Sequence, residues 1–182
     1  MRPVHLDLGD GAELRRFSLR DAETLFALVD AERERLRRWL PWVDGVRTAE
    51  DERAWLKAVL SSAALREEGY GIWARGELAG CVGMHLDALN DGADIGYWLG
   101  RAFEGRGLVT RACGALIDRG FGELRLHRIT IHAAPDNARS RAVPERLGFT
   151  QEAVLRQAGK TAVGYVDLVV YSMLDREWEA RS

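Results

Sequence analysis

The spacing of the apolar residues changes near Tyr70, and this change restricts most strongly the folds open to the chain. After a short first strand, apolar residues recur at helical intervals, as at Ala22, Leu25, Phe26 and Val29. From Tyr70 onward the period becomes that of strands separated by glycine-containing turns. The chain therefore combines a mainly helical first part with a strand-rich second part.

Individual elements follow from the same patterns. The predicted helices cover Leu19–Glu32, Arg33–Leu40, the stretch from Thr48 to about Glu67, Leu108–Phe121 and Ala138–Leu147. The predicted strands cover Ala12–Phe17, Tyr70–Arg75, Leu78–Leu86, Ala93–Gly100, His127–Ala134, Phe149–Leu155 and Tyr165–Leu174. Helices and strands interleave without strict βαβ repetition, so we predict an α/β or α+β fold with a mixed sheet. It forms one domain over residues 1–182, with its core at about 12–176.

Short motifs mark several element ends. Thr48-Ala49-Glu50-Asp51 resembles a capping box, and Pro41 is expected to end the helix before it. Gly76-Glu77 and Asp91-Gly92 predict the turns between three consecutive antiparallel strands.

Composition excludes several classes of protein. Hydrophobic residues make up 47% of the chain, too many for a disordered polypeptide, and the net charge of −2 gives no overall attraction to nucleic acid or membranes. The start of the chain lacks an apolar signal region and no apolar run is long enough to span a bilayer, so we expect a cytoplasmic protein. Cys81 and Cys113 have neither a CxxC partner nor ligand spacing with histidine, so we predict no disulfide and no metal site.

Charge is unevenly distributed. Residues 101–146 carry 9 basic and 5 acidic side chains, whereas residues 1–100 carry 13 basic and 18 acidic ones. A positive region within a mildly acidic protein favours a site for a small anion. The alternative is an exposed arginine-rich helix.

A glycine-containing turn between a strand and a helix is the most informative segment. The strand Asp94–Gly100 leads into Arg101–Arg111, where Gly105 and Gly107 allow a tight turn whose backbone N–H groups point outward. The start of the following helix adds unpaired N–H donors, so the segment can hold phosphate oxygens, with Arg106 and Arg111 adding charge. The segment matches neither GxxxxGK[ST] nor GxGxxG, and such a turn can also simply connect a strand to a helix.

A second segment, Asn137–Phe149, opens a short helix. Asn137 is a natural N-cap, and Ser140 faces the same end of the helix. Pro144 removes the N–H that would bond to the Ser140 carbonyl, so we expect the helix to bend or end early there. Without further information, a capped structural helix is an equally good interpretation.

Together these segments make the chain resemble the GNAT superfamily of acyl-CoA-dependent N-acetyltransferases, in particular the RimJ/RimL type, which acetylates the N-termini of ribosomal proteins. The matching segments, spread over nearly the whole chain, are Leu14-Arg15 with Asp21-Ala22-Glu23, Leu36–Trp42, Ile95–Leu99, Glu104–Thr110 and Asn137–Phe149. The resemblance implies a mostly antiparallel twisted sheet of about seven strands flanked by helices. It also implies that acetyl-CoA binds in a cleft between two splayed parallel strands.

The resemblance further implies which residues hold the cofactor. The superfamily's pyrophosphate loop reads Q/R-x-x-G-x-G/A; here Glu104-Gly-Arg-Gly107-Leu-Val109 matches at Gly107 and departs at Glu104 and Val109. Because this loop binds phosphate through backbone N–H groups, we expect the Glu104 side chain to point away. The cofactor-binding residues so predicted are Trp98, Leu99, Gly100, Glu104, Gly105, Arg106, Gly107, Leu108, Val109, Thr110, Arg111, Asn137 and Ser140.

For catalysis the resemblance points to Ser140 and Asp94. Many members place a tyrosine seven residues after the asparagine as general acid for the thiolate, but that position is Pro144 here. In RimL-like proteins the serine that matches Ser140 has this role. Asp94 matches a strand position where several members carry a glutamate base, and its shorter side chain favours a relay water. The other candidates for the base are Glu67, Glu68 and His85.

The acceptor is less determined than the donor. The first hypothesis is an N-acetyltransferase acting on the N-terminus of a ribosomal or other protein, with Trp39 and Trp42 in the core or lining the acceptor groove. The second is an acetyltransferase for a small amine such as an aminoglycoside or polyamine. The third is a CoA-binding module without turnover. Analogy with the family makes a homodimer plausible, and direct attack in a ternary complex is expected because neither cysteine stands beside a histidine base.

Overall fold

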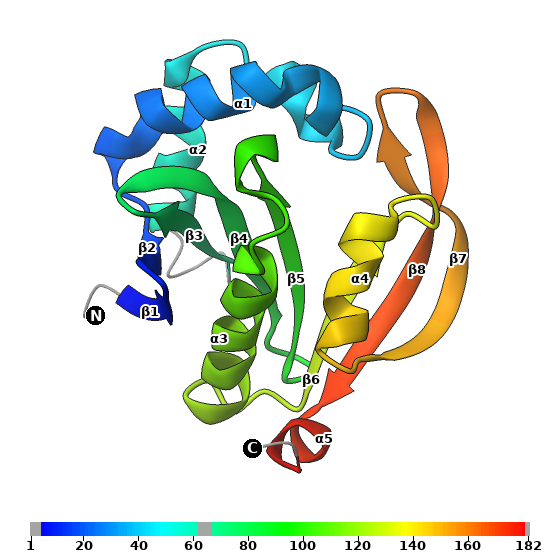
Figure 1. Cartoon of the computed structure of the whole chain (residues 1–182). Coiled ribbons are helices and arrows are strands. Elements are labelled where there is room, and N and C mark those ends of the chain that lie inside the picture. Colours follow the sequence, from blue (N-terminus) through cyan, green and yellow to red (C-terminus); the bar gives the residue numbers. More distant parts are fainter. Residues whose placement is uncertain (1–4, 62–66, 181–182) are drawn as a thin grey trace.

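An eight-stranded sheet runs through the part of the chain that the computed structural model describes, residues 5–61 and 67–180 (Figure 1). Its strand order is β1-β2-β3-β4-β5-β6-β8-β7, and every neighbouring pair is antiparallel except β5 and β6. The strands are β1 (His5–Gly9), β2 (Ala12–Arg16), β3 (Glu67–Ala74), β4 (Glu77–Asp87), β5 (Gly92–Leu99), β6 (Arg128–Ala133), β7 (Thr150–Thr161) and β8 (Gly164–Leu174).

Helices cover both faces of this sheet and enclose two hydrophobic cores. The smaller core lies between the sheet and α1 with α2, and the larger one between the sheet and α3 with α4. The described helices are α1 (Ala22–Leu36), α2 (Ala49–Ser61), α3 (Leu108–Gly122), α4 (Ala138–Arg146) and α5 (Asp175–Glu179), with 3-10 turns at Leu19–Asp21, Pro41–Gly45 and Arg101–Phe103.

Alternation along β5 divides its side chains between the two cores. Ile95 is buried in the larger core and Tyr97 packs against it, whereas Trp98 packs against the smaller one. Because strand side chains alternate, Asp94 points to the same face as Trp98. This division places chemically different groups on the two faces of one strand.

The predicted mixed, mostly antiparallel sheet flanked by helices is confirmed, and so is the helix that follows the glycine turn. Reciprocal hydrogen bonds between Thr48 and Asp51 also confirm the capping box. The turn predicted at Gly76-Glu77 is instead centred on Arg75 and Gly76, which both have positive φ.

Other boundaries differ from the predictions. Separate helices over Leu19–Glu32 and Arg33–Leu40 are wrong: α1 is continuous to Leu36, because Arg33 and Arg35 pair with acidic residues one turn earlier. Pro41 opens a 3-10 turn after it. The helix predicted to reach about Glu67 is described as α2 over Ala49–Ser61, and Glu67 itself lies in β3; positions 62–66 of the prediction lie outside the described residues.

The edge strand β1 is not among the strands that the sequence patterns predict. Its residues are mostly exposed or half-buried and Leu8 is the buried one, so the alternation that marks a strand is weak. The sheet therefore has one strand more, among the described residues, than the seven that the sequence predicts.

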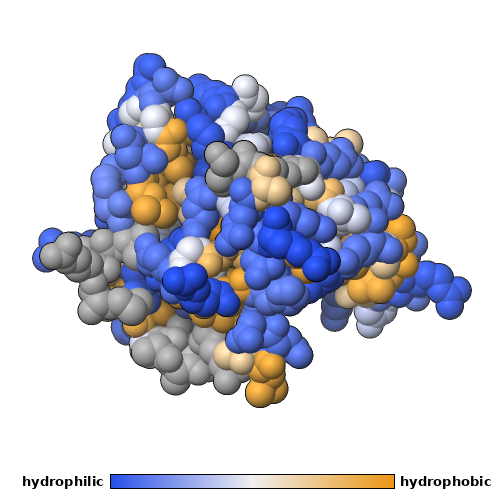
Figure 2. All heavy atoms as spheres, turned by 90° about the horizontal axis from the view of Figure 1, so that it is seen from below, coloured by the Kyte–Doolittle hydropathy of each residue, from blue (hydrophilic) through white to orange (hydrophobic). Residues whose placement is uncertain are grey.

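The surface is largely hydrophilic. Seen from below, it shows separate apolar areas within a mainly polar face (Figure 2). Large exposed apolar side chains include Leu89, Val163 and Tyr165. Among the described residues, no helix combines the length and apolar character that a membrane span requires.

A largely buried ion pair fastens α3 to β3. The Arg119 guanidinium contacts both oxygens of Glu68, at 3.0 and 3.2 Å, and the Tyr70 hydroxyl donates to the same carboxylate at 2.8 Å. Burial alone would raise the pKa of Glu68, but the hydrogen bonds from Arg119 and Tyr70 outweigh it and hold this pKa below its ordinary value. Glu68 therefore serves the packing of α3 and lies on the face opposite Asp94.

Removing one partner of the Glu68–Arg119 pair should lower the stability of the folded protein. We expect Arg119→Met to lower the free energy of unfolding by about 3 kcal/mol, because it leaves a buried carboxylate without its cation. The double variant Glu68→Met/Arg119→Met should lose less of its free energy of unfolding, because no charge is then left buried without a partner.

The same pair makes stability depend on pH. Since the pKa of Glu68 is lowered by folding, its stabilising contribution is present at neutral pH and is lost as the pH falls through that lowered value. Urea unfolding between pH 7 and pH 3 checks both points; equal losses in single and double variants would contradict them.

Candidate active site

The two parallel strands separate after a short paired region. β5 and β6 pair at Gly92↔Arg128, Ala93↔Ile129 and Asp94↔Thr130, although β5 continues to Leu99. Beyond Asp94 no described strand pairs with β5 on its β6 side; we call this interruption in the sheet the opening, and α4 lies across it (Figure 1).

Backbone groups of β5 line this opening. The Gly100 N–H donates to the Ala79 carbonyl in β4, so alternate peptide groups counted back from Gly100 face β4. The peptide groups of Ile95, Tyr97 and Leu99 consequently face the opening. Of the predicted trio Trp98, Leu99 and Gly100, Leu99 is the one turned this way, and its carbonyl accepts a hydrogen bond from Arg35.

The glycine turn stands at the end of β5. Gly105 and Gly107 both have positive φ, which residues with a Cβ rarely adopt, and a Cβ on either would meet no atom within 4 Å. The first helical hydrogen bond of α3 runs from the Arg111 N–H to the Gly107 carbonyl at 3.0 Å. The N–H groups of Leu108, Val109 and Thr110 therefore precede the helical ladder, as a backbone phosphate site requires.

The predicted arginines lie on the β1 side of this turn. Arg111 donates to Asp10 at 2.7 Å, and Arg106 donates to the Ala102 carbonyl at 2.9 Å. Both line a cavity of about 630 Å³ together with residues of the β1–β2 and β3–β4 turns. The arginine side chains thus lie beside the turn, while the N–H groups of Leu108, Val109 and Thr110 lie at the start of the helix.

Glu104 is held between two helices. Its carboxylate accepts hydrogen bonds from Arg35 of α1 at 3.1 Å and from Arg139 of α4. The neighbouring Arg101 N–H donates to Glu32 of α1 at 2.8 Å. The negative charge of Glu104 is therefore compensated, and this side chain ties the glycine turn to both sides of the opening.

Ser140 lies at the opening in the first turn of α4. The Asn137 side chain accepts the Ser140 N–H at 3.2 Å, which confirms the predicted N-cap. The Ser140 Oγ lies 3.5 Å from the Tyr97 hydroxyl. The helix continues through Pro144 to Arg146, so of the predicted bend or early end, the early end is wrong.

Asp94 belongs to a row of titratable side chains on the opposite face. It accepts a hydrogen bond from the Thr130 hydroxyl at 3.1 Å, and His132 Nδ1 lies 3.7 Å from the same oxygen. His85 is its neighbour in β4 and lies 3.6 Å from Glu67 in β3. The one sequence feature that places His132 on this face is its position two residues after Thr130 on a strand. The described residues hold no group of three or more His, Cys, Asp or Glu side chains suited to a metal ion.

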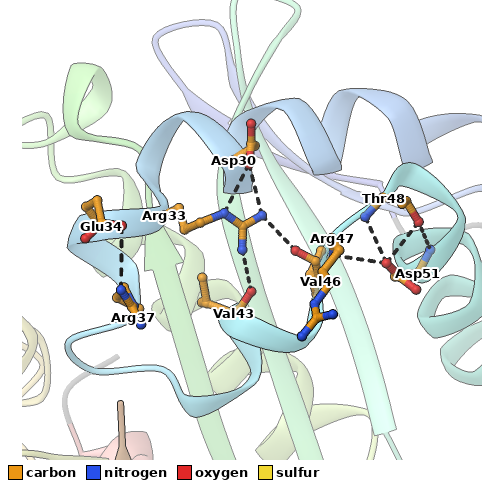
Figure 3. A network of polar contacts seen from close by, with 9 residues as sticks. All are labelled: Asp30, Arg33, Glu34, Arg37, Val43, Val46, Arg47, Thr48 and Asp51. Carbon is orange, nitrogen blue, oxygen red and sulfur yellow. Dashed lines mark hydrogen bonds and ion pairs between the residues drawn. The ribbon is translucent and has the colours of Figure 1, made fainter. Parts of the chain in front are cut away.

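A tightly held loop forms a wall on the Asp94 face. Arg33 of α1 donates to the carbonyls of Val43 and Val46, each at 2.7 Å, and also binds Asp30 (Figure 3). The loop carries Trp42, whose ring centroid lies 6.2 Å from that of Trp98. Trp42 is 40% exposed, so its ring forms part of the accessible surface beside β5.

Comparisons with known proteins agree with this geometry. The acetyltransferase (GNAT) domain family matches residues 12–150. The chain is 39% identical over 172 residues to YdaF of Bacillus subtilis (strain 168), covering 91% of this chain and 92% of that protein. It is 29% identical over 174 residues to the ribosomal-protein-serine acetyltransferase of Escherichia coli (strain K12), covering 93% and 96%. The solved structure of RimL, a ribosomal L7/L12 alpha-N-protein acetyltransferase, in complex with coenzyme A has a TM-score of 0.89 at 26% identity, covering 94% of this chain and 98% of that chain.

The glycine turn can be tested directly. We expect Gly107→Val to weaken coenzyme A binding roughly tenfold or more, because the β-branched side chain strains a positive φ and covers several N–H donors, each worth about 1 kcal/mol. Gly122→Val, at the other end of α3, is the matched control and should bind normally. Isothermal calorimetry gives the affinities and thermal unfolding confirms that both variants fold. Unchanged affinity in a folded Gly107→Val variant would rule out this phosphate site.

Proposed function

The chain belongs to the GNAT acetyltransferase family, and from this premise we propose that it transfers the acetyl group of acetyl-CoA to the N-terminal amino group of a ribosomal protein. One observation carries the proposal. The opening between β5 and β6 has a backbone phosphate site at its end, a hydroxyl on one face and a carboxylate on the other. In transfer from acetyl-CoA to an amine, these elements can serve in turn as a pyrophosphate site, a hydrogen-bond donor to the departing sulfur and a base for the amine.

Acetyl-CoA fits the opening through the backbone. Its pyrophosphate would accept hydrogen bonds from the N–H groups at Gly105–Val109, where α3 also contributes the positive end of its dipole. Its pantetheine arm would pair with the outward peptide groups of Ile95 and Tyr97 in β5, as an added strand does. This arrangement brings the thioester to the level of Tyr97 and Ser140. The complex of RimL with coenzyme A supports this donor.

The two faces of the sheet would then serve opposite ends of the reaction. The acceptor amine enters from the Asp94 face and loses a proton to Asp94, directly or through a water. Its nitrogen attacks the thioester carbon. As the tetrahedral intermediate collapses, the C–S bond breaks, the nitrogen releases its second proton to solvent, and coenzyme A leaves as a thiolate that takes a proton from solvent. The Ser140 hydroxyl donates a hydrogen bond to the sulfur as negative charge develops there.

Direct transfer agrees with the state of the cysteines. Burial raises the pKa of the Cys81 thiol to about 12 and also raises that of Cys113, so neither is a ready thiolate nucleophile at neutral pH. No acetyl-enzyme is needed in this mechanism.

The ribosomal acceptor is supported by the relatives. The Escherichia coli relative is named a ribosomal-protein-serine acetyltransferase and RimL acts on ribosomal L7/L12. The exposed ring of Trp42 beside Trp98 offers an apolar wall for the residues that follow a peptide N-terminus.

Mass spectrometry separates the possible acceptors. Purified ribosomal proteins and a panel of small amines, including polyamines and aminoglycosides, are incubated with the enzyme and acetyl-CoA. We expect a 42-dalton increase (the mass of one acetyl group replacing one hydrogen, roughly) on the N-terminus of a ribosomal protein. Acetylation of small amines alone would contradict the proposed acceptor, and the absence of any product would contradict an acetyltransferase.

Ser140→Ala tests the group that receives the thiolate. If the hydroxyl bonds to sulfur mainly in the transition state, its loss should lower kcat by about 10²-fold and leave acetyl-CoA affinity unchanged. Ser61→Ala, an exposed serine in α2, is the control. A Ser140→Ala enzyme with normal kcat would remove Ser140 from the mechanism.

Asp94→Asn tests the base. The amide keeps the size of the side chain and can still accept from Thr130, but it cannot take a proton. The rate deficit should shrink as the pH rises toward about 8 and above, because an α-amino group then loses its proton unaided. Steady-state rates between pH 6 and pH 9.5 give this profile. A deficit that is constant with pH would instead assign Asp94 to substrate positioning.

A further inference from the structure

The carbonyl of Ser140 has a partner from outside its own helix. In an α-helix this carbonyl would accept the N–H of the residue four positions later, which is Pro144 and has no N–H. The helix nevertheless runs on to Arg146 with Pro144 buried inside it. A helical carbonyl at the opening is thereby left for another donor.

Tyr97 supplies that donor. Its hydroxyl donates to the Ser140 carbonyl at 2.7 Å, a short and well-formed hydrogen bond across the opening from β5 to α4. Burial raises the pKa of Tyr97, so the hydroxyl keeps its proton throughout the neutral range. The bond is therefore present at every pH at which the enzyme is expected to work.

Ser140 is consequently fixed at both of its peptide groups. The Asn137 side chain accepts its N–H at 3.2 Å, and Tyr97 donates to its carbonyl. The Ser140 Oγ lies 3.5 Å from the Tyr97 hydroxyl, too far for a strong hydrogen bond, so the Ser140 proton remains available to another acceptor. The Tyr97 proton, by contrast, is used on the carbonyl.

We propose that Tyr97 is a positioning residue, which uses the carbonyl freed by Pro144 to hold Ser140 against the thioester sulfur. This rests on the role of Ser140 in the proposed function. In many relatives of this fold a general acid is expected at the position of Pro144. Here the proline instead leaves the Ser140 carbonyl without a helical donor, and the Tyr97 hydroxyl of β5 takes that place. Tyr97 acts through Ser140 and is not itself the proton donor.

The variants Tyr97→Phe, Ser140→Ala and their combination test this. Tyr97→Phe keeps the ring, and we expect it to lower kcat roughly 10- to 100-fold, since small misplacements of a reacting group have effects of this size. Acetyl-CoA affinity should stay within about twofold, because the phosphate site is elsewhere. In the Ser140→Ala background, Tyr97→Phe should cause little further loss, since both changes remove one function.

Tyr165→Phe is the matched control. Tyr165 is 69% exposed on the β7–β8 hairpin, far along the chain from α4, and its substitution should leave kcat unchanged. Thermal unfolding confirms that each variant folds.

Pro144→Ala provides a second test that does not depend on the Tyr97→Phe variant alone. It restores an N–H that can bond to the Ser140 carbonyl within the helix. In this background Tyr97→Phe should cost several-fold less in kcat than in the wild type.

The outcomes distinguish this inference from the proposed function. An impaired Ser140→Ala enzyme with a normal Tyr97→Phe enzyme would overturn the role of Tyr97 and leave the proposed function intact. Equal losses from Tyr97→Phe with and without Ser140 would show that Tyr97 acts independently, which also overturns it. Normal rates in Ser140→Ala would overturn the role of Ser140 in the proposed function and this inference with it.

Discussion

The short parallel pairing of β5 with β6 is the constraint on which the site depends. Pairing stops at Asp94↔Thr130, and the peptide groups of Ile95, Tyr97 and Leu99 are then turned toward an opening instead of a neighbouring strand. Backbone polar groups cannot be buried without partners, so an opening of this kind must admit water, a side chain or a ligand. A pantetheine arm, with its two amides, has the chemistry to complete the ladder. The remainder of the site is arranged around this interruption, with the glycine turn at the end of β5 and α4 across the gap.

Strand alternation explains how one site can present a base and a thiolate partner from different sides. Asp94 lies on the face of β5 that carries α1 and α2, and Tyr97, three residues later, lies on the face of α3 and α4. In the tetrahedral intermediate the attacking nitrogen and the departing sulfur are different substituents of the thioester carbon, so groups on the two faces of the strand can serve them separately. The two side chains also have different contacts. Asp94 contacts the side chains of Thr130 and His132 in β6, whereas the Tyr97 hydroxyl donates to the backbone carbonyl of Ser140.

The charged side chains around the opening mainly form ion pairs that connect the elements of the site. Glu104, an unexpected acid in a phosphate loop, is neutralised by Arg35 and Arg139, and in this way it links α1, the glycine turn and α4. Arg111 forms an ion pair with Asp10. The N–H groups at the start of α3 carry no net charge, and an anion can approach them closely because Gly105 and Gly107 lack side chains. Five of the nine basic residues in 101–146 form ion pairs, namely Arg111, Arg119, Arg128, Arg139 and Arg141, so much of the positive charge of this segment is compensated within the fold.

Local signals in the sequence determined the parts of this protein that depend on neighbouring residues. The glycine turn with the helix after it, the Asn137 cap and the Thr48–Asp51 capping box each involve residues a few positions apart, and each is present as predicted. Features set by distant contacts were decided by the tertiary structure alone. The edge strand β1 gains its place by pairing with β2, and the loop after α1 gains its place because Arg33 donates to the carbonyls of Val43 and Val46. The bond from Tyr97 to Ser140 joins residues 43 apart, and the sequence shows only that Pro144 leaves a carbonyl free, not which donor the folded chain brings to it. Spacing along the chain encodes helices, strands and caps, whereas partners across a sheet opening are chosen by how the elements pack.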